Sequence, residues 1–547
     1  MSHQAAIEGG LTEEGPTQAA ADDGLPHKVP ARRGFSVVYR GRALLSLHDP
    51  LGQAERVVEA LLPAQERTLY LCPSPLYAYA LGSFREALPP SSALLCVEAD
   101  KTLYEWTLAN APPDAPPLLH TQDPPSLCRF VRETWGPRTF RRALLVRLTG
   151  GYDLEAVLYE AFVDALRRDI QIQWGNALTL TRLGRRYIRN AIRNLPLLAF
   201  PTTASLTAGA APLLVAGAGP SLDAFLDGAA GAIGPGVCVV AVDTSLRPLL
   251  ERGITPALVV ALEAQHWNLA DFAGAVGRPI PLAMDFSALP ATAGCLAGQP
   301  LLFFTPWTKL RLFTRLAAAG LLPPAFPPLG SVGLSAVALA LRLTTGPVIT
   351  AGLDFSFTAD AYHCRGSPGH RAFLQRRSRL TGPYPSAALF RAGSVRALSK
   401  SGLPVRTDPS LQHYRALFRA EFGANERIFD IEGGGLSLGV QTLSVRGALA
   451  RLRASPAAFK AAGDADCAAR GARLRSFIAG ERALLERLRA ALAGTGGAHL
   501  DSLLDDADYL WAHFPDCAGA GGRRPPASDA GFLKRVRAEA DSFLKLW

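Results

Sequence analysis

Leu213–Asp223 has the sequence LLVAGAGPSLD, in which four apolar residues precede a glycine-rich turn. The apolar run predicts a buried strand, and the glycines allow a tight turn after it. Pro220 suits the first turn of a helix, where its missing N–H would have no partner in any case. Such a turn brings backbone N–H groups close to a phosphate, so the stretch predicts a nucleotide or phosphate site. The predicted contacts are Gly217, Gly219, Pro220 and Ser221.

This turn is not the dinucleotide-binding fingerprint, because Leu222 occupies the position of the third glycine. The sequence also lacks a P-loop with Gly-Lys-Ser/Thr, a Gly-x-Ser-x-Gly elbow, a His-Glu-x-x-His motif and the kinase loop set. These absences exclude the commonest motif-defined hydrolases and kinases.

Further apolar runs follow the turn at regular intervals and alternate with helical patterns. The predicted strands are 213–216, 237–242, 257–262, 280–284, 301–304 and 348–352, and the predicted helices between them include 222–230 and 332–343. This alternation is typical of an α/β domain with a Rossmann-like, mostly parallel sheet. We place this central domain at residues 206–440.

Acidic residues follow four of the predicted strands, at Asp243, Glu263, Asp285 and Asp354. Ligands of open α/β sheets bind beyond the carboxyl ends of the strands, so we expect at least two of the four to face a ligand. Asp243 and Thr244, with Glu263, are expected to converge on the glycine turn. Their oxygens could bind ribose hydroxyls or Mg²⁺, and the alternative is that they cap the following helices.

Asp354 leads into a loop that carries His363 and Arg365. Together they could supply an acid or base and a cation for a leaving phosphate, which makes all three candidate catalytic residues. The alternative is a packed or solvated histidine. Ser331 is a predicted N-cap whose helix offers free amides, either as a second anion or sugar contact or simply as a capped buried helix.

The flanks of the chain differ in pattern from its centre. Among 547 residues we expect a disordered tail at 1–30, an α/β domain at 31–150, a helical connector at 151–205 and a helical domain at 441–547. The connector is expected to hold two helices, 154–168 and 176–195. The second carries an arginine stripe, which we interpret as a solvated face, and the alternative is a wall above an anionic ligand.

The charge and the cysteine content of the chain indicate which partners it binds and in which cellular compartment it functions. The formal net charge of +10 favours an anionic partner, but the basic residues are spread along the chain and show no nucleic-acid-binding signature. None of the eight cysteines forms a C-x-x-C pair, which favours a reducing compartment. The sequence predicts no signal peptide and no transmembrane segment, so we expect a cytoplasmic protein.

The ordered motifs resemble those of the motility accessory factor (Maf) proteins, which are flagellin glycosyltransferases. The central domain also resembles the archaeal 6-hydroxymethylpterin diphosphokinase MptE, and its Gly-x-Gly-Pro-Ser-Leu turn is similar to the CMP-binding turn of bacterial sialyltransferases. The matching segments are 215–222, 242–244, 253–256, 330–332, 352–355, 363–367 and 431–435. The flanks fit more weakly, and Glu263 stands where the Maf family commonly has Asp.

The resemblance implies transfer of a nonulosonic (sialic- or pseudaminic-like) sugar from a CMP donor to Ser or Thr of flagellin, with no required cofactor. Gly217, Gly219 and Ser221 would then hold the nucleotide phosphate, and Asp243 and Glu263 would position ribose or sugar. His363 or Asp354 would act as acid or base, and Arg365 would steady the leaving phosphate.

Two alternatives stay open. The first is a diphosphokinase that transfers pyrophosphate from ATP to a pterin alcohol, with Mg²⁺ held by Asp243 and Glu263. The second is a non-catalytic accessory protein that binds flagellin. The length of the chain favours the transferase, because a protein-modifying enzyme must grip a macromolecular acceptor.

Overall fold

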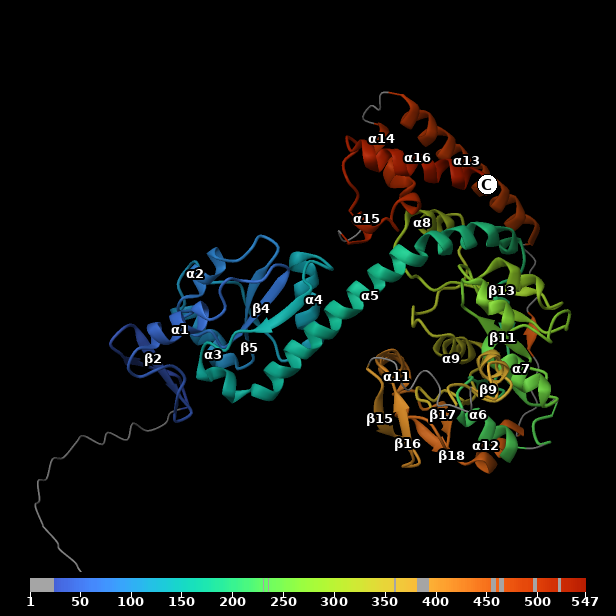
Figure 1. Cartoon of the computed structure of the whole chain (residues 1–547), viewed down its shortest axis with the longest axis horizontal. Coiled ribbons are helices and arrows are strands. Elements are labelled where there is room, and N and C mark those ends of the chain that lie inside the picture. The colour runs from blue at the N-terminus through green and yellow to red at the C-terminus, as the bar shows by residue number, and fades with distance from the viewer. Residues whose placement is uncertain are drawn as a thin grey trace, which may run out of the picture. The chain divides into compact units, whose positions relative to one another are not determined.

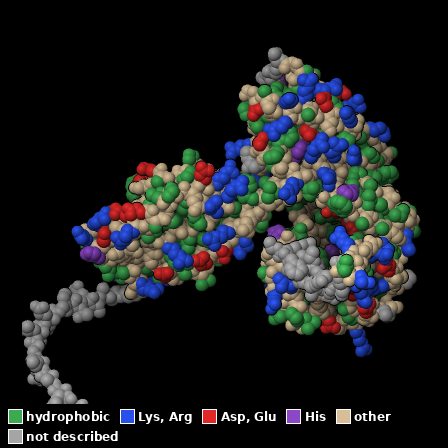
Figure 2. Space-filling model, in the orientation of Figure 1, with side chains coloured by type: hydrophobic (Ala, Val, Ile, Leu, Met, Phe, Trp, Pro, Cys, Tyr) green, Lys and Arg blue, Asp and Glu red, His purple; other side chains and the backbone are tan. Residues whose placement is uncertain are grey.

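The structure is a computed structural model that describes residues 24–229, 231–234, 236–358, 361–380, 393–453, 459–461, 467–494, 499–519 and 523–547. The chain divides into two compact units. The first unit comprises Met1–Thr179 and Pro515–Arg523, and the second comprises Leu180–Phe514 and Arg524–Trp547. On the face shown in Figure 2, Lys and Arg side chains are scattered among acidic and apolar ones rather than gathered in one patch.

The second unit is built around an eight-stranded sheet in which every neighbouring pair is parallel (Figure 1). In spatial order its strands are β13 (Pro300–Phe303), β12 (Leu282–Asp285), β11 (Leu258–Ala261), β10 (Cys238–Val242), β9 (Leu213–Ala216), β14 (Val348–Ala351), β17 (Ile428–Ile431) and β18 (Gln441–Leu443). The expected α/β class with a mostly parallel sheet is therefore confirmed. The sheet extends to Leu443, beyond the boundary of 440 that the sequence suggested.

The strand order reverses at β9. Strands β10 to β13 extend from one side of β9, and β14, β17 and β18 extend from the other. In the register of this junction Leu213 pairs with Val348 and Ala216 pairs with Ala351. The glycine-rich turn after Ala216 consequently lies beside the turn after Ala351, at the edge where open α/β sheets bind ligands.

Seven described α-helices lie between these strands in sequence or follow the last of them. They are α6 (Ser221–Gly228), α7 (Asp243–Glu251), α8 (Arg311–Ala318), α9 (Val332–Leu343), α10 (Pro368–Gln375), α11 (Pro409–Phe422) and α12 (Val445–Arg453). Among them, α6, α7, α9 and α12 contact strands of the sheet. Two small antiparallel pairs, β15 (Val395–Leu398) with β16 (Pro404–Thr407) and β8 (Leu206–Thr207) with β19 (Lys460–Ala461), complete this part. Helix α9 packs on the central strands through Leu334, Val337 and Leu343, which are fully or almost fully buried.

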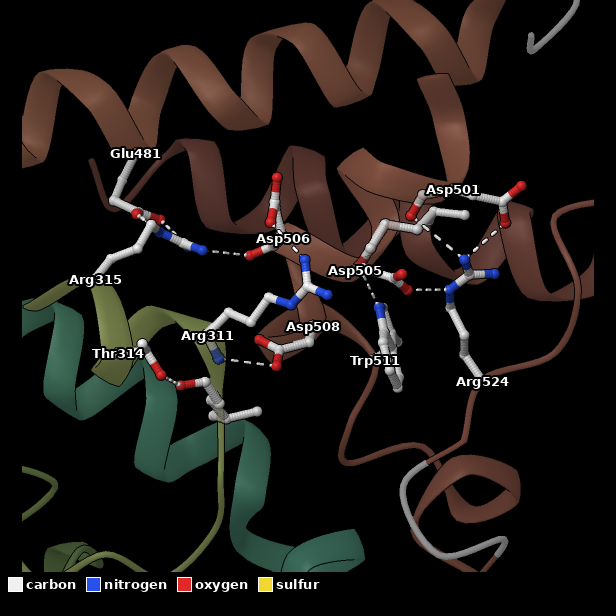
Figure 3. A network of polar contacts seen from close by, with 12 residues as sticks. Arg311, Thr314, Arg315, Glu481, Asp501, Asp505, Asp506, Asp508, Trp511 and Arg524 are labelled. Atoms are coloured by element: carbon white, nitrogen blue, oxygen red, sulfur yellow. Dashed lines mark hydrogen bonds and ion pairs between the residues drawn. The ribbon is translucent and has the colours of Figure 1, made fainter. Parts of the chain in front are cut away.

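The C-terminal helices α13 (Cys467–Ala493), α14 (His499–Asp506) and α16 (Ala530–Leu544) belong to the same compact unit as the sheet. Figure 3 shows the polar network that joins α8 to α13 and to α14 with the residues that follow it. Arg315 of α8 donates two hydrogen bonds to the buried carboxylate of Glu481, at 2.5 and 2.9 Å. Arg311 donates from its side chain to Asp506 and from its backbone N–H to Asp508.

One helix, α5 (Ala156–Asn194), replaces the two helices expected at 154–168 and 176–195. The turn expected between them does not form, because residues 169–175 contain no proline and only one glycine, Gly175. The arginine stripe on its second half is not simply solvated. Arg185 pairs with Glu539 of α16 at 2.8 Å and also donates to Ser542, as does Arg189.

The first unit contains a four-stranded parallel sheet in the order β6 (Leu118–His120), β5 (Ala93–Glu98), β4 (Thr68–Pro73) and β7 (Arg142–Leu145). Its helices are α1 (Pro50–Glu59), α2 (Leu81–Glu86), α3 (Lys101–Asn110), α4 (Pro124–Trp135), the start of α5, and α15 (Pro515–Gly519). A separate antiparallel sheet joins β1 (His27–Pro30), β2 (Phe35–Tyr39) and β3 (Arg42–Ala43).

The predicted disordered tail therefore ends too late, because β1 pairs with β2 from His27 onward. Residues 1–23 of that tail lie outside the described residues. Among the described helices, none combines the length and the apolar character that a membrane crossing requires.

Candidate functional site

Ser221, at the start of α6, is bound to Asp354 at the junction between β9 and β14. The Ser221 backbone N–H donates to Asp354 Oδ2 at 2.7 Å, and the Ser221 hydroxyl donates to Asp354 Oδ1. Asp354 is 4% exposed, and burial raises the pKa of its carboxyl while the Ser221 hydrogen bonds lower it. An internal carboxylate thus occupies the helix N-terminus where an external anion was expected.

The glycines of the turn permit this close approach. A Cβ on Gly217 would collide with the carbonyl oxygen of Gly352, and one on Gly219 would lie 2.6 Å from Asp354 Oδ2. Gly435 makes room from the other side, since its Cβ would lie 2.8 Å from Asp354 Oδ1 and its φ is +92°. The glycines therefore allow two backbone turns and a carboxylate to pack together.

The predicted phosphate-binding amides are already used inside the protein. Gly217 N–H donates to Ala351 O and Gly219 N–H to Gly352 O, each at 2.8 Å, and Ser221 N–H donates to Asp354. Pro220 is the N-cap of α6 rather than its first helical residue. These amides therefore donate to acceptors at the end of β14 and in the turn after it, where a phosphate was expected to accept.

Two residues that the sequence analysis missed lie beside Asp354. Lys400 Nζ and Asp430 Oδ2 form an ion pair at 2.5 Å, with both side chains less than a tenth exposed. Thr350 also donates to Asp430, at 2.9 Å. Burial raises the pKa of Asp430, and Lys400 opposes that rise. The available signal was a charged residue inside the apolar strand Ile428–Ile431, since a buried charge requires a partner.

The loop with His363 and Arg365 contacts the glycine turn through Ala218. Cys364 N–H donates to Ala218 O at 2.9 Å, and His363 Nδ1 lies 3.3 Å from the same oxygen. The Arg365 guanidinium pairs with Asp227 and lies 3.6 Å from Asp223 on α6. Arg365 therefore fastens the loop to α6.

A cluster of carboxylates follows β10 and β11. Asn268 Nδ2 donates to Asp243 Oδ2 at 2.8 Å and to Asp271 Oδ2 at 3.1 Å. Asp243 Oδ1 accepts from the backbone and the hydroxyl of Thr244. We call Asp243, Asn268 and Asp271 the carboxylate–amide cluster.

The carboxylate–amide cluster titrates close to neutral pH. Burial raises the pKa of Asp243 to about 6, and burial followed by the charge of Asp243 raises the pKa of Asp271 to about 7. Asp243 is buried, whereas Asp271 is partly exposed. Ser245 donates to Ala216 O at 2.8 Å, which ties the end of β10 to the end of β9 beside it.

Asp243 and Thr244 were predicted from the sequence as site residues. Two further members of the site, Asn268 and Asp271, were not predicted. Both lie at or directly after a short 3₁₀ turn, His266–Ala270, three residues apart. Glu263 is exposed, accepts a hydrogen bond from Gln265 N–H at 2.9 Å and contributes a charge that raises the pKa of both aspartates.

Asp285 has a structural role instead of the ligand contact considered for it. It is fully buried, and its two oxygens accept hydrogen bonds from the backbone and hydroxyl groups of Ser287 and Thr305. These four bonds join the turn after β12 to the turn after β13, so this carboxylate replaces missing backbone partners.

Ser331 is the N-cap of α9, as predicted, but its side chain makes no capping hydrogen bond. A Cβ on Gly333, in the first turn, would lie 2.6 Å from Leu353 Cδ2, which places this helix start beside the end of β14. The first-turn amides of a helix have no intrahelical acceptor, so α9 offers an N-terminus suited to an anion.

The magnesium site considered for Asp243 and Glu263 does not fit these residues. Both oxygens of Asp243 already accept hydrogen bonds, and Glu263 Oε1 accepts one from Gln265. Within the described ranges, no group of three or more His, Cys, Asp or Glu side chains is arranged to hold a metal ion.

Comparisons with known proteins agree with this architecture. Residues 189–360 match the family model described as 6-hydroxymethylpterin diphosphokinase MptE-like. The chain is 31% identical over 553 residues to an uncharacterized protein of Treponema pallidum (strain Nichols), and the match covers 95% of each. Its fold is similar to that of the Maf glycosyltransferase from Magnetospirillum magneticum AMB-1, with a TM-score of 0.51 and 14% identity over 95% of this chain and 90% of that chain.

Proposed function

The chain belongs to the family of Maf-like proteins, and on that premise we propose that it is a glycosyltransferase. Its donor is a nucleotide-activated sugar, which we take to be a CMP-linked nonulosonic acid, and its acceptor is a Ser or Thr hydroxyl of flagellin. The observation that carries the proposal is the carboxylate–amide cluster at the carboxyl edge of the parallel sheet.

Glycosyl transfer to a hydroxyl requires a base for the acceptor proton. A base works best when its pKa is near the operating pH, and the cluster meets this condition through the raised pKa values of Asp243 and Asp271. Asp271 is the partly exposed member, so we assign the base to Asp271. The acceptor oxygen bonds to the anomeric carbon, its proton passes to Asp271, and the bond from the anomeric carbon to the donor phosphate oxygen breaks.

The leaving phosphate needs a group that stabilises negative charge. Ser221 is engaged with Asp354, so we assign this task to the N-terminus of α9 at Ser331. Ser331 was among the predicted contacts, and α9 begins beside the end of β14. A role for Arg365 at this phosphate would require its pairs with Asp223 and Asp227 to open.

Asp354 and His363 have supporting tasks in this proposal. Asp354 fixes the glycine turn through Ser221, and His363 lies against Ala218 of the same turn. We assign Asp243 and Glu263 to the ribose or sugar, and their charges raise the pKa of Asp271.

One observation favours a second function. The family model that matches residues 189–360 is named for a diphosphokinase, so ATP-dependent pyrophosphate transfer is the alternative. It depends on Mg²⁺, for which Asp243 and Glu263 give no fitting donor set.

A ligand panel separates these functions. The full chain is heated with CMP, CDP, ATP or GTP, with and without Mg²⁺, and the shift in Tm is recorded. The transferase predicts stabilisation by cytidine nucleotides without metal. Stabilisation only by ATP with Mg²⁺ would favour the diphosphokinase, and no shift with any nucleotide would favour a non-catalytic accessory role.

A further inference from the structure

The second unit contains a cavity of about 680 Å³ that is lined by residues of α11 and of the β15–β16 pair. It lies outside the segment matched by the family model. Arg415 and Arg419 line it, one helical turn apart on α11. Ser399, Gln412 and Ser437 add polar groups to the wall. The volume falls within the range of about 300–1,000 Å³ that is usual for small-molecule sites.

The two arginines carry positive charge that the described residues do not neutralise. Arg415 Nε donates to the carbonyl oxygen of Ser437 at 2.7 Å, and no described carboxylate forms an ion pair with either guanidinium. Burial, and then the charge of Arg419, lower the pKa of Arg415. Like charges one turn apart on a helix repel each other, so this pair is maintained at a cost to stability.

Arg419 lies against the backbone of Gly439. Gly439 has a φ of +82°, and a Cβ there would lie 3.1 Å from Arg419 Nε and 3.6 Å from its Cγ. The arginine side chain therefore packs directly on the Gly439 backbone.

The cavity adjoins the junction of β9 and β14. Leu436, which lines it, donates its N–H to Asp354 O at 2.8 Å. Lys400, next to the lining residue Ser399, donates its N–H to Gly435 O at 2.8 Å. Two backbone hydrogen bonds therefore connect the wall of the cavity to the Asp354 turn and to Gly435 beside it.

We propose that this cavity binds an oxyanion of a small polar ligand, a carboxylate or a phosphate, between the guanidinium groups of Arg415 and Arg419. Planar guanidinium groups match both anions through paired hydrogen bonds. The site does not depend on the proposed glycosyl transfer, because anion binding is measured directly and without turnover.

The test is isothermal titration calorimetry of the full chain in low-salt, phosphate-free buffer. The probes are glucuronate, inorganic phosphate and, as a neutral reference, glucose. We expect saturable binding of at least one anion and none of glucose. Binding of glucuronate alone assigns a carboxylate ligand, and binding of phosphate alone assigns a phosphoryl group.

Variants locate the site. Arg419→Gln is expected to weaken anion binding at least tenfold, and Arg396→Gln, which removes an exposed charge from β15 outside the cavity, less than twofold. Gly439→Ala keeps both arginines but would place a Cβ 3.1 Å from Arg419 Nε, and the small shift that this forces on the side chain should weaken binding less than Arg419→Gln does. Absence of saturable binding for both anions, or equal losses in Arg396→Gln and Arg419→Gln, would overturn the proposal.

Discussion

The backbone N–H of Ser221 donates a 2.7 Å hydrogen bond to Asp354 Oδ2, and the Ser221 hydroxyl donates to the second oxygen of the same carboxylate. This pairing joins the start of α6 to the end of β14, across the point where the strand order reverses. The helix N-terminus most typical of phosphate binding is therefore filled by the protein's own anion.

Ser221→Ala is predicted to destabilise the protein without abolishing nucleotide binding. The variant removes one hydrogen bond to a buried charged group, which is worth about 1.5–3 kcal/mol. Urea unfolding measures the loss, and the nucleotide Kd should change less than threefold. A large loss of nucleotide affinity with an unchanged free energy of unfolding would instead show that Ser221 binds the nucleotide phosphate.

Gly219→Ala is predicted to destabilise the protein strongly. Its Cβ would lie 2.6 Å from Asp354 Oδ2 and 2.8 Å from Gly352 O, and the second atom is backbone that cannot easily move. Overpacking of this kind costs about 1–3 kcal/mol or more. Gly294→Ala is the matched control, because its Cβ would meet nothing within 4 Å. Equal Tm values for the two variants would show that the turns do not pack as described.

Asp271→Asn and Asp285→Asn are predicted to separate chemistry from structure. Asp271 is the proposed base, so its variant should keep nearly the wild-type Tm and lose about 10²–10⁴-fold in transfer rate. Asp285 accepts four hydrogen bonds, so its variant should lose about 1–3 kcal/mol of stability. The transfer rate per folded molecule should then stay close to wild type. A loss of stability in Asp271→Asn together with a loss of transfer rate in Asp285→Asn would refute the roles given to these two carboxylates.

Asp243 makes stability depend on pH in a predictable direction. Its pKa is raised to about 6 in the folded state, so the folded protein binds the proton more tightly than the unfolded chain does. The resulting stability is fully present below the ordinary value of about 4 and is lost as the pH rises through about 6. The Asp243→Asn variant has no carboxyl group at this position, so its stability does not include this pH-dependent contribution.

The measurement for Asp243 is the difference in unfolding free energy between wild type and Asp243→Asn from pH 4 to pH 8. We expect the wild type to decline relative to the variant by on the order of 1–3 kcal/mol across this range. A flat difference would mean that the Asp243 carboxyl is not buried as the structure shows.

Much of the central fold follows from local patterns in the sequence. The runs that become β9 and α9 have the predicted bounds, because each is strongly apolar and ends at a glycine or threonine. The bounds of α7 were not predicted, although Asp243 was expected either to face a ligand or to cap the following helix. Asp243 is the first residue of this helix, which contains Pro248.

The site was predicted less completely, for a physical reason. The pattern at Gly217–Ser221 shows which amides approach an anion, but not whether that anion is a ligand or Asp354, 133 residues further along the chain. The same holds for Lys400 with Asp430 and for Asn268 with its two aspartates. Pairings of this kind are set by which strand ends become neighbours, and periodicity does not report that order.

The most direct test of the proposed function is turnover of a CMP-linked nonulosonic acid with flagellin as acceptor, without added metal. Release of CMP is followed by chromatography, and the mass of flagellin by mass spectrometry. The proposed function predicts stoichiometric CMP release and sugar addition by the wild type, and at least a hundredfold slower reaction by Asp271→Asn. Formation of AMP from ATP and a pterin alcohol, with no CMP release from the sugar donor, would contradict it.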